Sequence, residues 1–501
     1  MDPSFWALLP PIVAIVVSLI TKEVNLSLAL GLLVGAGIYS HFNPFTTVTT
    51  ALDVMSARVY GNMGVIIFII LLGMIVHLMN LSGATHKYAQ WASRRIKSRK
   101  QSLLATTLLG IIIFVDDYFN CLTVGTIMRP ITDRNHISRE KLAYIIDSTA
   151  APICMIAPVS SWAAAVSSSL PEDSSIDGFQ LFLRTIPANF YSLLALVMIF
   201  GTILLNVDFG KMRRCEQEAM NNAKLTEYPA AEADENDDPD NNSSVMDLVL
   251  PVAALIVLSI IAMLYTGGLF EGGISIKDAF ANCDAITGLA MGGFYTIIFV
   301  AALYLPRKIV TVKEYLDGLV EGFKKMVPAT LILALAWSIS GICGSDYLNA
   351  GGYVAKMVSE HSVPLAPMPA LFFVIAVLLA FATGTSWGTF GIMLPIAISV
   401  FGDQIGVLTV MTTAAILSGS VCGDHLSPIS DTTILSSTGA DCDHYQHFTT
   451  QFQYGLLVAV VSTIGFLVGG YTESIAIGFV SGFAALACCL FVIKKKTGEL
   501  A

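Results

Sequence analysis

Apolar runs of roughly 17–25 residues recur along the whole sequence, and each is long enough to cross a bilayer as a helix. A transmembrane barrel would instead show alternating strands of ~10 residues, and the sequence contains no such pattern. Composition agrees, because only 13% of the 501 residues are charged, against about 25% in an average soluble protein. The sequence therefore predicts an all-α polytopic membrane protein.

An acidic, polar stretch at residues 225–247 separates two hydrophobic halves and accounts for part of the net charge of −10. Its composition predicts a disordered linker. The first span, near residues 5–20, lacks a cleavage site and is interpreted as a retained helix. The nine cysteines show no metal or disulfide spacing. We therefore expect a first membrane repeat at 1–206, an acidic cytoplasmic linker at 207–246, a second membrane repeat at 247–471, and an extra span with a basic tail at 472–501.

Basic residues gather in a few loops, and cytoplasmic loops are enriched in Lys and Arg. Segment 102–128 has basic flanks at both ends, so we expect a re-entrant hairpin with its tip at 114–120. The matching hairpin is expected at 369–395, centred on 381–391. This layout puts the N-terminus outside and the C-terminus in the cytoplasm. The basic segments are 87–100, 129–141, 211–224, 307–325 and 494–496.

The remaining apolar segments predict the same number of full spans in each half. Because five is odd, the second half lies inverted relative to the first, which is an inverted-topology repeat with one hairpin in each half. Four short matches in the same order support it, among them 147–161 with 423–437 and 126–131 with 391–396. The five spans of the first half lie near 5–20, 25–40, 62–81, 141–158 and 189–206, those of the second near 247–266, 286–304, 326–344, 405–422 and 453–471, and a last span covers 475–493.

Polar side chains enter these apolar segments at four places, and each is a candidate site because an intramembrane charge is costly without a partner. The first place contains two adjacent carboxylates, which need a cation, a proton or a cavity, although one of them could cap the second hairpin helix. The candidate residues are Asp116, Asp117, Asn120 and Thr123 in the first place, Asp147, Ser148 and Thr149 in the second, Thr383, Thr385 and Ser386 in the third, and Asp424, His425, Ser427, Asp431 and Thr432 in the fourth.

In the second place, Pro152 frees backbone carbonyls that, with Asp147 and the neighbouring hydroxyls, could form an oxygen cage suited to Na+. Those hydroxyls could instead satisfy the kinked backbone. In the third place, glycines permit both exposed carbonyls and close helix packing. In the fourth, His425 is either a proton shuttle or a structural donor. Asp424 and Asp431 share one face if helical, or line two sides of a cavity if Pro428 breaks the helix.

No Lys or Arg lies well inside any of the four places, so the predicted cavity is net acidic. That charge favours Na+, H+ or an amine-bearing substrate. An organic anion would need backbone donors, helix N-termini or co-bound Na+ to offset its charge.

The segments FVDDYFNCLTVG (114–125), DSTAAPICMIAPVSSW (147–162) and especially GDHLSPISDTT (423–433) resemble the NhaC-type Na+/H+ antiporter family, within the larger ion-transporter superfamily. The likeness runs from about residue 5 to 471. It implies a bacterial or archaeal inner-membrane protein with a scaffold and an elevator-like transport domain, and it allows a homodimer. It also implies Na+ sites among Asp116, Asp117, Asp147, Asp424 and Asp431, with Asn120, Thr383, Ser386 and Ser427 beside them.

We therefore expect a Na+-coupled secondary active transporter, most simply a Na+/H+ antiporter in which both ions compete for buried Asp residues. The alternative is a Na+-coupled symporter or exchanger of a small organic solute, an amino acid or a carboxylate such as malate or lactate. In that case Trp162, Trp387, Tyr118 and Asn120 would shape a pocket, although both tryptophans could serve packing alone. We expect no organic cofactor, nucleic acid or enzymatic activity, because no nucleophile motif, metal-ligand spacing or nucleotide-binding loop is present.

Overall fold

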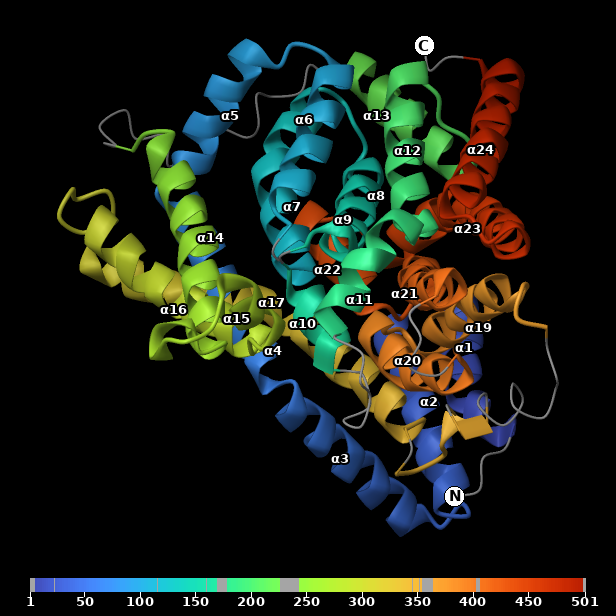
Figure 1. The fold of residues 1–501 in the computed structure, drawn as a ribbon. Helices are drawn as coiled ribbons and strands as arrows, with labels where there is room; N and C mark the ends of the chain where they lie inside the picture. The colour runs from blue at the N-terminus through green and yellow to red at the C-terminus, as the bar shows by residue number, and fades with distance from the viewer. Residues whose placement is uncertain are drawn as a thin grey trace.

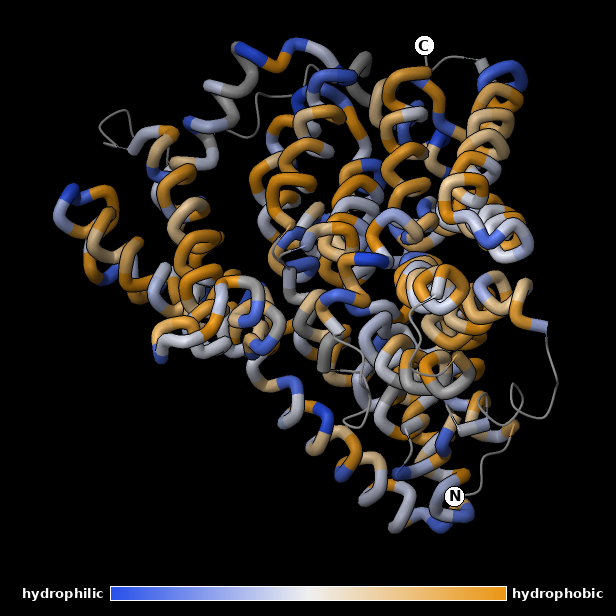
Figure 2. The backbone as a smooth tube through the Cα atoms, viewed as in Figure 1, coloured by the Kyte–Doolittle hydropathy of each residue, from blue (hydrophilic) through white to orange (hydrophobic). Residues whose placement is uncertain are grey.

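The computed structural model describes residues 5–21, 23–114, 116–158, 160–168, 178–225, 243–344, 346–350, 352–353, 364–401 and 406–498. Within these ranges every regular element is a helix, which confirms the all-α prediction (Figure 1). Hydrophobic residues run along most of α14 and α24, whereas hydrophilic residues gather at helix ends and connections (Figure 2).

The first half of the chain folds into a series of helices that are interrupted around residues 113–116 and 150. The helices are η1 (Phe5–Leu8), α1 (Leu9–Thr21), α2 (Val24–Tyr39), α3 (Pro44–Gly61), α4 (Met63–Leu81), α5 (Ala84–Arg95), α6 (Arg99–Ile112), α7 (Asp117–Arg134), α8 (Arg139–Thr149), α9 (Ala151–Ile156), α10 (Ser161–Ser168), α11 (Gly178–Thr185), η2 (Ile186–Ala188) and α12 (Phe190–Leu205).

The second half is interrupted in the same manner around residues 384–385 and 427–430. Its helices, after α13 (Gly210–Leu225), are α14 (Met246–Thr266), η3 (Leu269–Glu271), α15 (Ile276–Ala281), α16 (Ala285–Tyr304), α17 (Val312–Ile342), α19 (Met368–Thr383), α20 (Ser386–Phe401), α21 (Val407–Leu426), α22 (Asp431–Ala440), α23 (His444–Thr472) and α24 (Ile475–Thr497).

Six helices of the described residues are long and apolar enough to cross a membrane, namely α4, α14, α16, α21, α23 and α24. The number rises to eight if α2 with α3, bent by 119°, and α11–η2 with α12, bent by 42°, each count as one span. These helices match eight of the eleven predicted spans. The other three predicted spans are helical too, near 5–20, 141–158 and 326–344. The span near 141–158 is split at Ala150 into α8 and α9, and the span near 326–344 is the end of the longer α17.

Both predicted hairpin segments are pairs of helices that pack against each other, α6 with α7 and α19 with α20. Asp116 caps α7, since its Oδ1 accepts a 3.0 Å hydrogen bond from the Phe119 backbone N–H. In the second pair, Gly384 has φ +67° between the two helices. Both breaks therefore fall inside the predicted tips, at 114–120 and 381–391.

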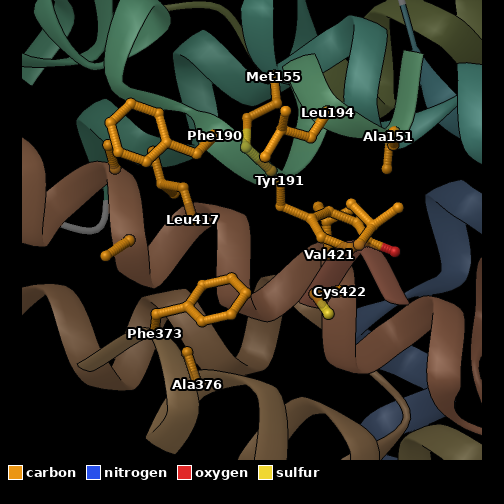
Figure 3. Close-up of a cluster of buried hydrophobic side chains, with 14 of the residues drawn as sticks. Ala151, Met155, Phe190, Tyr191, Leu194, Phe373, Ala376, Leu417, Val421 and Cys422 are labelled. Carbon is orange, nitrogen blue, oxygen red and sulfur yellow. The ribbon is translucent and has the colours of Figure 1, made fainter. Parts of the chain in front are cut away.

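Helix α21 forms the centre of the molecule. In its most apolar stretch of 18 residues, 89% of the residues are buried, against 22% in the corresponding stretch of α24. Figure 3 shows how α9 and α12 of the first half pack on α19 and α21 of the second. Phe190 and Leu194 face this core from one side, and Phe373 and Leu417 from the other (Figure 3). The two halves of the sequence thus share one hydrophobic core.

Helices α7 and α22 approach closely because a glycine lies on each at the contact. A Cβ atom built on Gly125 would lie 2.3 Å from the backbone of Gly439. The same approach holds in reverse, with a Cβ on Gly439 only 2.3 Å from the Cys121 carbonyl oxygen. This contact brings the start of α22 beside the first candidate place on α7.

The segment predicted as an acidic linker begins with a docked helix, α13. Its Glu216 is buried, pairs with Arg99 at the start of α6, and accepts a 2.8 Å hydrogen bond from the Ser138 backbone. Residues 226–242, the most acidic part of the predicted linker, lie outside the described residues.

Candidate functional site

Three consecutive residues at the start of α22 each contact a different polar group. Asp431 Oδ2 accepts a 2.7 Å hydrogen bond from the Tyr118 hydroxyl. Thr432 Oγ1 donates to Asp424 Oδ2 at 3.0 Å, and Thr433 Oγ1 donates to Asp147 Oδ2 at 3.1 Å. Ser430 caps α22 by accepting the Thr433 N–H at 3.2 Å, which fixes where the helix begins. The first turn of α22 thus joins three buried carboxylates.

The Asp424 carboxylate is surrounded by oxygen atoms. Its Oδ2 accepts hydrogen bonds from Ser386 Oγ at 2.9 Å and from Thr432 Oγ1 at 3.0 Å. Ser386 Oγ also lies 3.3 Å from the Ser420 carbonyl oxygen. The residue is fully buried, and Oδ1 has no hydrogen-bond partner among the described residues. A buried carboxylate with hydroxyls and a carbonyl nearby supplies the oxygen ligands that hard cations take.

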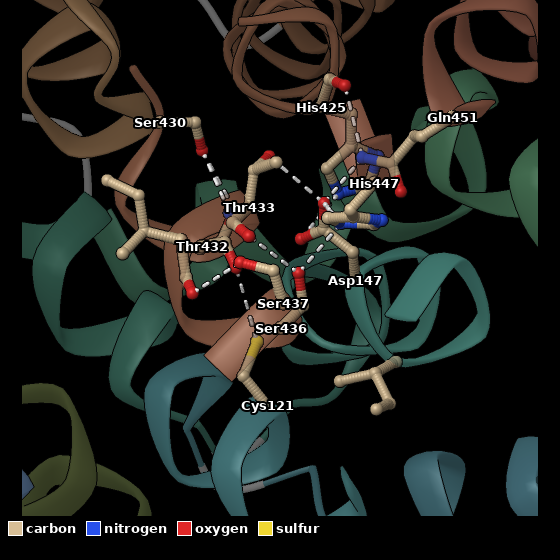
Figure 4. A network of polar contacts seen from close by, with 12 residues as sticks. Cys121, Asp147, His425, Ser430, Thr432, Thr433, Ser436, Ser437, His447 and Gln451 are labelled. Carbon is tan, nitrogen blue, oxygen red and sulfur yellow. Dashed lines mark hydrogen bonds and ion pairs between the residues drawn. The ribbon is translucent and has the colours of Figure 1, made fainter. Parts of the chain in front are cut away.

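The Asp147 carboxylate lies among nitrogen-bearing side chains instead (Figure 4). Its Oδ2 accepts hydrogen bonds from Thr433 Oγ1 and Gln451 Nε2, and His447 Nε2 lies 3.6 Å from the same oxygen. His425 Nε2 lies 3.9 Å from Oδ1. As at Asp424, the other oxygen, Oδ1, has no hydrogen-bond partner among the described residues, so the two carboxylates differ in that an amide and two imidazoles, and not hydroxyl and carbonyl oxygens alone, surround Asp147.

His425 and Gln451 tie this group to its surroundings. Gln451 Nε2 also donates to the His425 backbone carbonyl at 3.0 Å. His425 Nδ1 lies 3.1 Å from the Tyr191 hydroxyl on α12, so both ring nitrogens of His425 face polar atoms. The Tyr191 contact fits the interpretation of His425 as a structural donor, whereas its Nε2 has no hydrogen-bond partner among the described residues and proton transfer stays a prediction.

A cavity of about 160 Å³ lies beside these groups, between two sets of helices. One side comes from α3, α4, α16 and α17, and the other from α7, the start of α20 and α22. Asp116 and Asp431 supply its carboxylates, and Thr385 lines it as well. The lining residues are Arg58, Asn62, Val65, Phe68, Asp116, Tyr118, Ile286, Leu289, Trp337, Thr385, Trp387, Gly388 and Asp431.

Arg58 is a basic residue in the cavity lining that comes from outside the four polar places. The four polar places indeed hold no Lys or Arg, but Arg58 enters from α3, which none of them includes. The charged lining therefore consists of one guanidinium and two carboxylates, so its formal charge remains negative. Asp424 and Asp147 do not line this cavity.

Four predicted site residues support the backbone at helix breaks. Asn120 Nδ2 donates to the carbonyls of Gly110 and Ile113, both at 2.7 Å. The hydroxyls of Thr149 and Thr383 donate to carbonyls one turn earlier in their own helices, and Ser427 Oγ donates to the Phe381 carbonyl at 2.8 Å. For Thr149, this is the alternative in which the hydroxyl satisfies the kinked backbone.

The remaining predicted residues are buried at other points. Asp117 Oδ2 accepts a 3.2 Å hydrogen bond from Trp162 Nε1, which gives that tryptophan a polar partner as well as a packing role. Ser148 lies buried on α8 and Thr123 on α7, and the Thr123 hydroxyl has no hydrogen-bond partner within the described ranges. Of the predicted residues, those that line the cavity or the oxygen cluster are Asp116, Thr385, Ser386, Asp424, Asp431 and Thr432.

The sequence interpretation missed four residues that contact these groups. Thr433, His447 and Gln451 hold Asp147, and Arg58 lines the cavity. The run of polar residues at 444–451, ahead of an apolar stretch, was a signal for two of them. Arg58 is the one Lys or Arg between Lys22 and Lys87, which was a signal too.

No group of three or more His, Cys, Asp or Glu side chains within the described ranges is arranged to hold a metal ion. A transition-metal centre of that kind is therefore not seen in this part of the chain. The oxygen cluster at Asp424 differs, since a single carboxylate with neutral oxygens is the donor set of an alkali cation, which would be cargo here.

Comparisons with known proteins identify the family. A family model described as "Na+/H+ antiporter family" matches residues 172–471, more than half of the chain. An uncharacterized protein of Haemophilus influenzae is 37% identical over 98% of this chain and 96% of its own length. A malate-2H(+)/Na(+)-lactate antiporter of Bacillus subtilis is 31% identical over 34% of this chain and 36% of its own. The arginine/ornithine antiporter ArcD of Halobacterium salinarum is 28% identical over 46% of this chain and 42% of its own length. The chain belongs to the Na+/H+ antiporter family, a family of membrane transporters.

Proposed function

We propose that this protein is a secondary active antiporter that exchanges Na+ for H+ and that Asp424 binds both ions in turn. The observation that carries the proposal is the oxygen cluster at the break between α21 and α22. A fully buried carboxylate is costly unless a proton or a cation neutralises it. The hydroxyls of Ser386 and Thr432 lie within hydrogen-bond distance and can assist either state.

The Asp424 carboxylate and the hydroxyls of Ser386 and Thr432 serve both ions, because a hydroxyl can donate or accept. With the carboxylate ionised, the Ser386 and Thr432 hydroxyls donate to Oδ2. When Na+ is bound, the hydroxyls turn so that their lone pairs face the ion. A proton on Asp424 excludes the cation, so occupancy by one ion requires release of the other. Competition at one carboxylate couples the two fluxes.

We also propose that the two halves form an inverted-topology repeat that operates as an elevator. Breaks at corresponding places support the repeat, since α6–α7 pairs with α19–α20 and the break after α8 with that after α21. The cavity supports the movement, because it lies between α3, α4, α16 and α17 on one side and the broken helices on the other. In this proposal the broken helices carry the ions past the other set, in an inner membrane, with the N-terminus outside.

Exchange by the purified full-length protein in proteoliposomes tests the assignment. An outward-directed Na+ gradient should acidify the lumen of wild-type vesicles, and Asp424→Asn should abolish the change because an amide neither ionises nor binds H+. Asp317→Asn, an exposed Asp on α17, is the matched control and should exchange normally. Asp147→Asn should also lose exchange. Wild-type rates in both Asp424→Asn and Asp147→Asn would disprove the proposal.

A second candidate function is Na+-coupled exchange of a small organic solute. The specific observation in its favour is the cavity, whose volume of about 160 Å³ exceeds what a bare ion needs. Two relatives carry names that refer to organic solutes, malate and lactate in one and arginine and ornithine in the other. Under this function the Asp424 cluster keeps its role as the coupling-ion site.

A further inference from the structure

We infer that the cavity binds a small amino acid in its zwitterionic form, with the substrate carboxylate on Arg58 and the substrate ammonium on Asp116 and Asp431. The inference rests on the proposed function, because the ion bound at Asp424 drives the movement of this substrate. It adds a substrate class and a substrate-binding residue, Arg58, to that function.

The size of the cavity suits such a molecule. Its volume is about 160 Å³, and a cavity of about 150 Å³ in another protein holds a benzene molecule. A solute with about six to ten non-hydrogen atoms therefore fits, whereas a sugar phosphate or a nucleotide does not.

Arg58 is placed to bind a carboxylate. Its side chain lies in the last turn of α3 and lines the cavity, and its guanidinium has no ion-pair or hydrogen-bond partner among the described residues. Gly341 on α17 makes room for it, since a Cβ built there would lie 2.6 Å from Arg58 Nε. A guanidinium presents parallel N–H groups that match a carboxylate.

The carboxylates of Asp116 and Asp431 are placed to bind an ammonium group. They lie at the starts of α7 and α22, whereas Arg58 comes from the end of α3, so the two charges of a zwitterion have partners on different elements of the lining. The Tyr118 hydroxyl donates to Asp431 Oδ2 and holds that carboxylate in place. A dicarboxylate would instead put one of its two anionic groups against these acids.

Charge balance links this substrate to a coupling ion. One guanidinium and two carboxylates sum to a formal charge of −1, and a zwitterion leaves that sum unchanged. A further Na+ or proton is therefore needed to neutralise the loaded site. Thr432 joins the two positions, because it follows Asp431 in the chain and donates to Asp424.

The other walls of the cavity select the substrate side chain. Phe68, Trp337, Ile286 and Leu289 are apolar or aromatic, and they come from α4, α16 and α17. Trp387 adds an indole whose buried Nε1 has no hydrogen-bond partner within the described ranges. These walls favour an apolar or aromatic side chain over a charged one, and the aromatic faces also favour the ammonium group.

Ligand-induced thermal shift of the purified full-length protein, in buffer with Na+, tests the inference. The probes are L-leucine and L-isoleucine, with leucine analogues that each lack one charge: 4-methylpentanoate without the amine and 3-methylbutylamine without the carboxylate. At least one of the two amino acids should stabilise the protein. The affinity for that amino acid should exceed the affinities for both analogues and for L-malate by about 30-fold or more. This is the smallest loss of affinity usually seen when one partner of a buried charge pair is removed.

Variants then assign the residues. Arg58→Gln should weaken amino-acid binding by about 30-fold or more, and Arg58→Lys should keep part of the affinity. Lys313→Gln, an exposed residue of α17, is the matched control and should bind as wild type does. Trp387→Phe should weaken amino-acid binding less than Arg58→Gln does. A smaller loss in this second cavity variant shows that a change in the lining does not by itself unfold the protein.

The outcomes separate this inference from the proposed function. If Na+/H+ exchange is intact but neither amino acid shifts the melting temperature, or if either single-charge analogue binds as well, the inference is wrong and the proposed function stands. Unchanged binding by Arg58→Gln would overturn the inference too. If an amino acid binds through Arg58 but Na+ drives no proton movement, the inference stands and the proposed function fails.

Discussion

Thr432, the second residue of α22, donates a 3.0 Å hydrogen bond to Asp424, which lies in the last turn of α21. The bond spans the break at residues 427–430, so the position of α22 sets the environment of the Asp424 carboxylate. Thr433 makes the same kind of bond to Asp147 on α8. A displacement of the first turn of α22 therefore changes the contacts of both carboxylates together.

Replacing Thr432 by valine should weaken Na+ binding. The change removes one hydroxyl while keeping the volume, so Asp424 loses a donor and the cation loses a ligand. Hydrogen bonds to charged groups contribute about 1.5–3 kcal/mol, which predicts an apparent Na+ affinity lower by a factor of about 10 to 100. Na+-dependent acidification of proteoliposomes, measured against Na+ concentration, gives this affinity.

The conservative change Thr432→Ser is the control, because it keeps the hydroxyl and removes a methyl group. It should leave the Na+ affinity within a factor of about three. If Thr432→Val has the affinity of the wild type, the Thr432 hydroxyl takes no part in the ion site.

Replacing Gln451 by leucine should destabilise the protein. Gln451 Nε2 donates to the Asp147 carboxylate and to the His425 carbonyl, so the change removes one of the two donors to Asp147 Oδ2 and the side-chain donor to a buried carbonyl. Each unsatisfied buried group costs about 1–3 kcal/mol. Thermal unfolding in detergent should show a lower Tm. Gln446→Leu on the exposed start of the same helix is the comparison, and an equal shift there would mean that the buried contacts contribute nothing.

The fold was largely predictable from the sequence because the strongest signals in a membrane protein are local. Long apolar runs marked α4, α14, α16, α21 and α24 to within about four residues, whereas α23 begins at His444, nine residues before the span predicted at 453–471. Gly384 and the Asp116–Asp117 pair marked the two hairpin tips, since each residue type favours a helix break or cap. The docked helix α13 escaped prediction because its stability depends on a distant partner, the Arg99–Glu216 pair.

The candidate site was predictable only where its residues lie within the polar sequence motifs. Asp424 and Asp147 are conspicuous in apolar helices, but the sequence does not show which one is surrounded by oxygen atoms and which by nitrogen donors. That difference arises from Ser386 and Gln451, which approach from α20 and α23. Arg58 could not be predicted for the same reason. It lies far in the sequence from the polar motifs and reaches the cavity only when the protein is folded.

Replacing Gly384 by alanine should impair both folding and transport. Gly384 has φ +67°, where an L side chain costs about 1–2 kcal/mol, and its Cβ would lie 2.4 Å from the Ile429 carbonyl oxygen. The contact holds the hairpin tip against the α21–α22 break. Gly391→Ala in α20 is the control, because nothing lies within 4 Å of its Cβ and alanine favours a helix. We expect lower Tm and exchange for the first variant, and equal or higher Tm for the second. Equal Tm values would contradict the argument.

Single cysteines on a cysteine-free background should show that Ser98 and Asn135 face the same side of the membrane. These positions flank the α6–α7 pair, and a re-entrant hairpin returns the chain to the side from which it came. The basic segments 87–100 and 129–141 predict the cytoplasmic side for both. Thr472→Cys, exposed at the α23–α24 turn, is the opposite-side reference, since it lies one span before the basic tail. A membrane-impermeant maleimide added to whole cells should label Thr472→Cys alone, and label both Ser98→Cys and Asn135→Cys after permeabilisation. Labelling of Ser98→Cys and Asn135→Cys from opposite sides would require α6 and α7 to cross the membrane as one span, which would remove the hairpin and with it the inverted repeat.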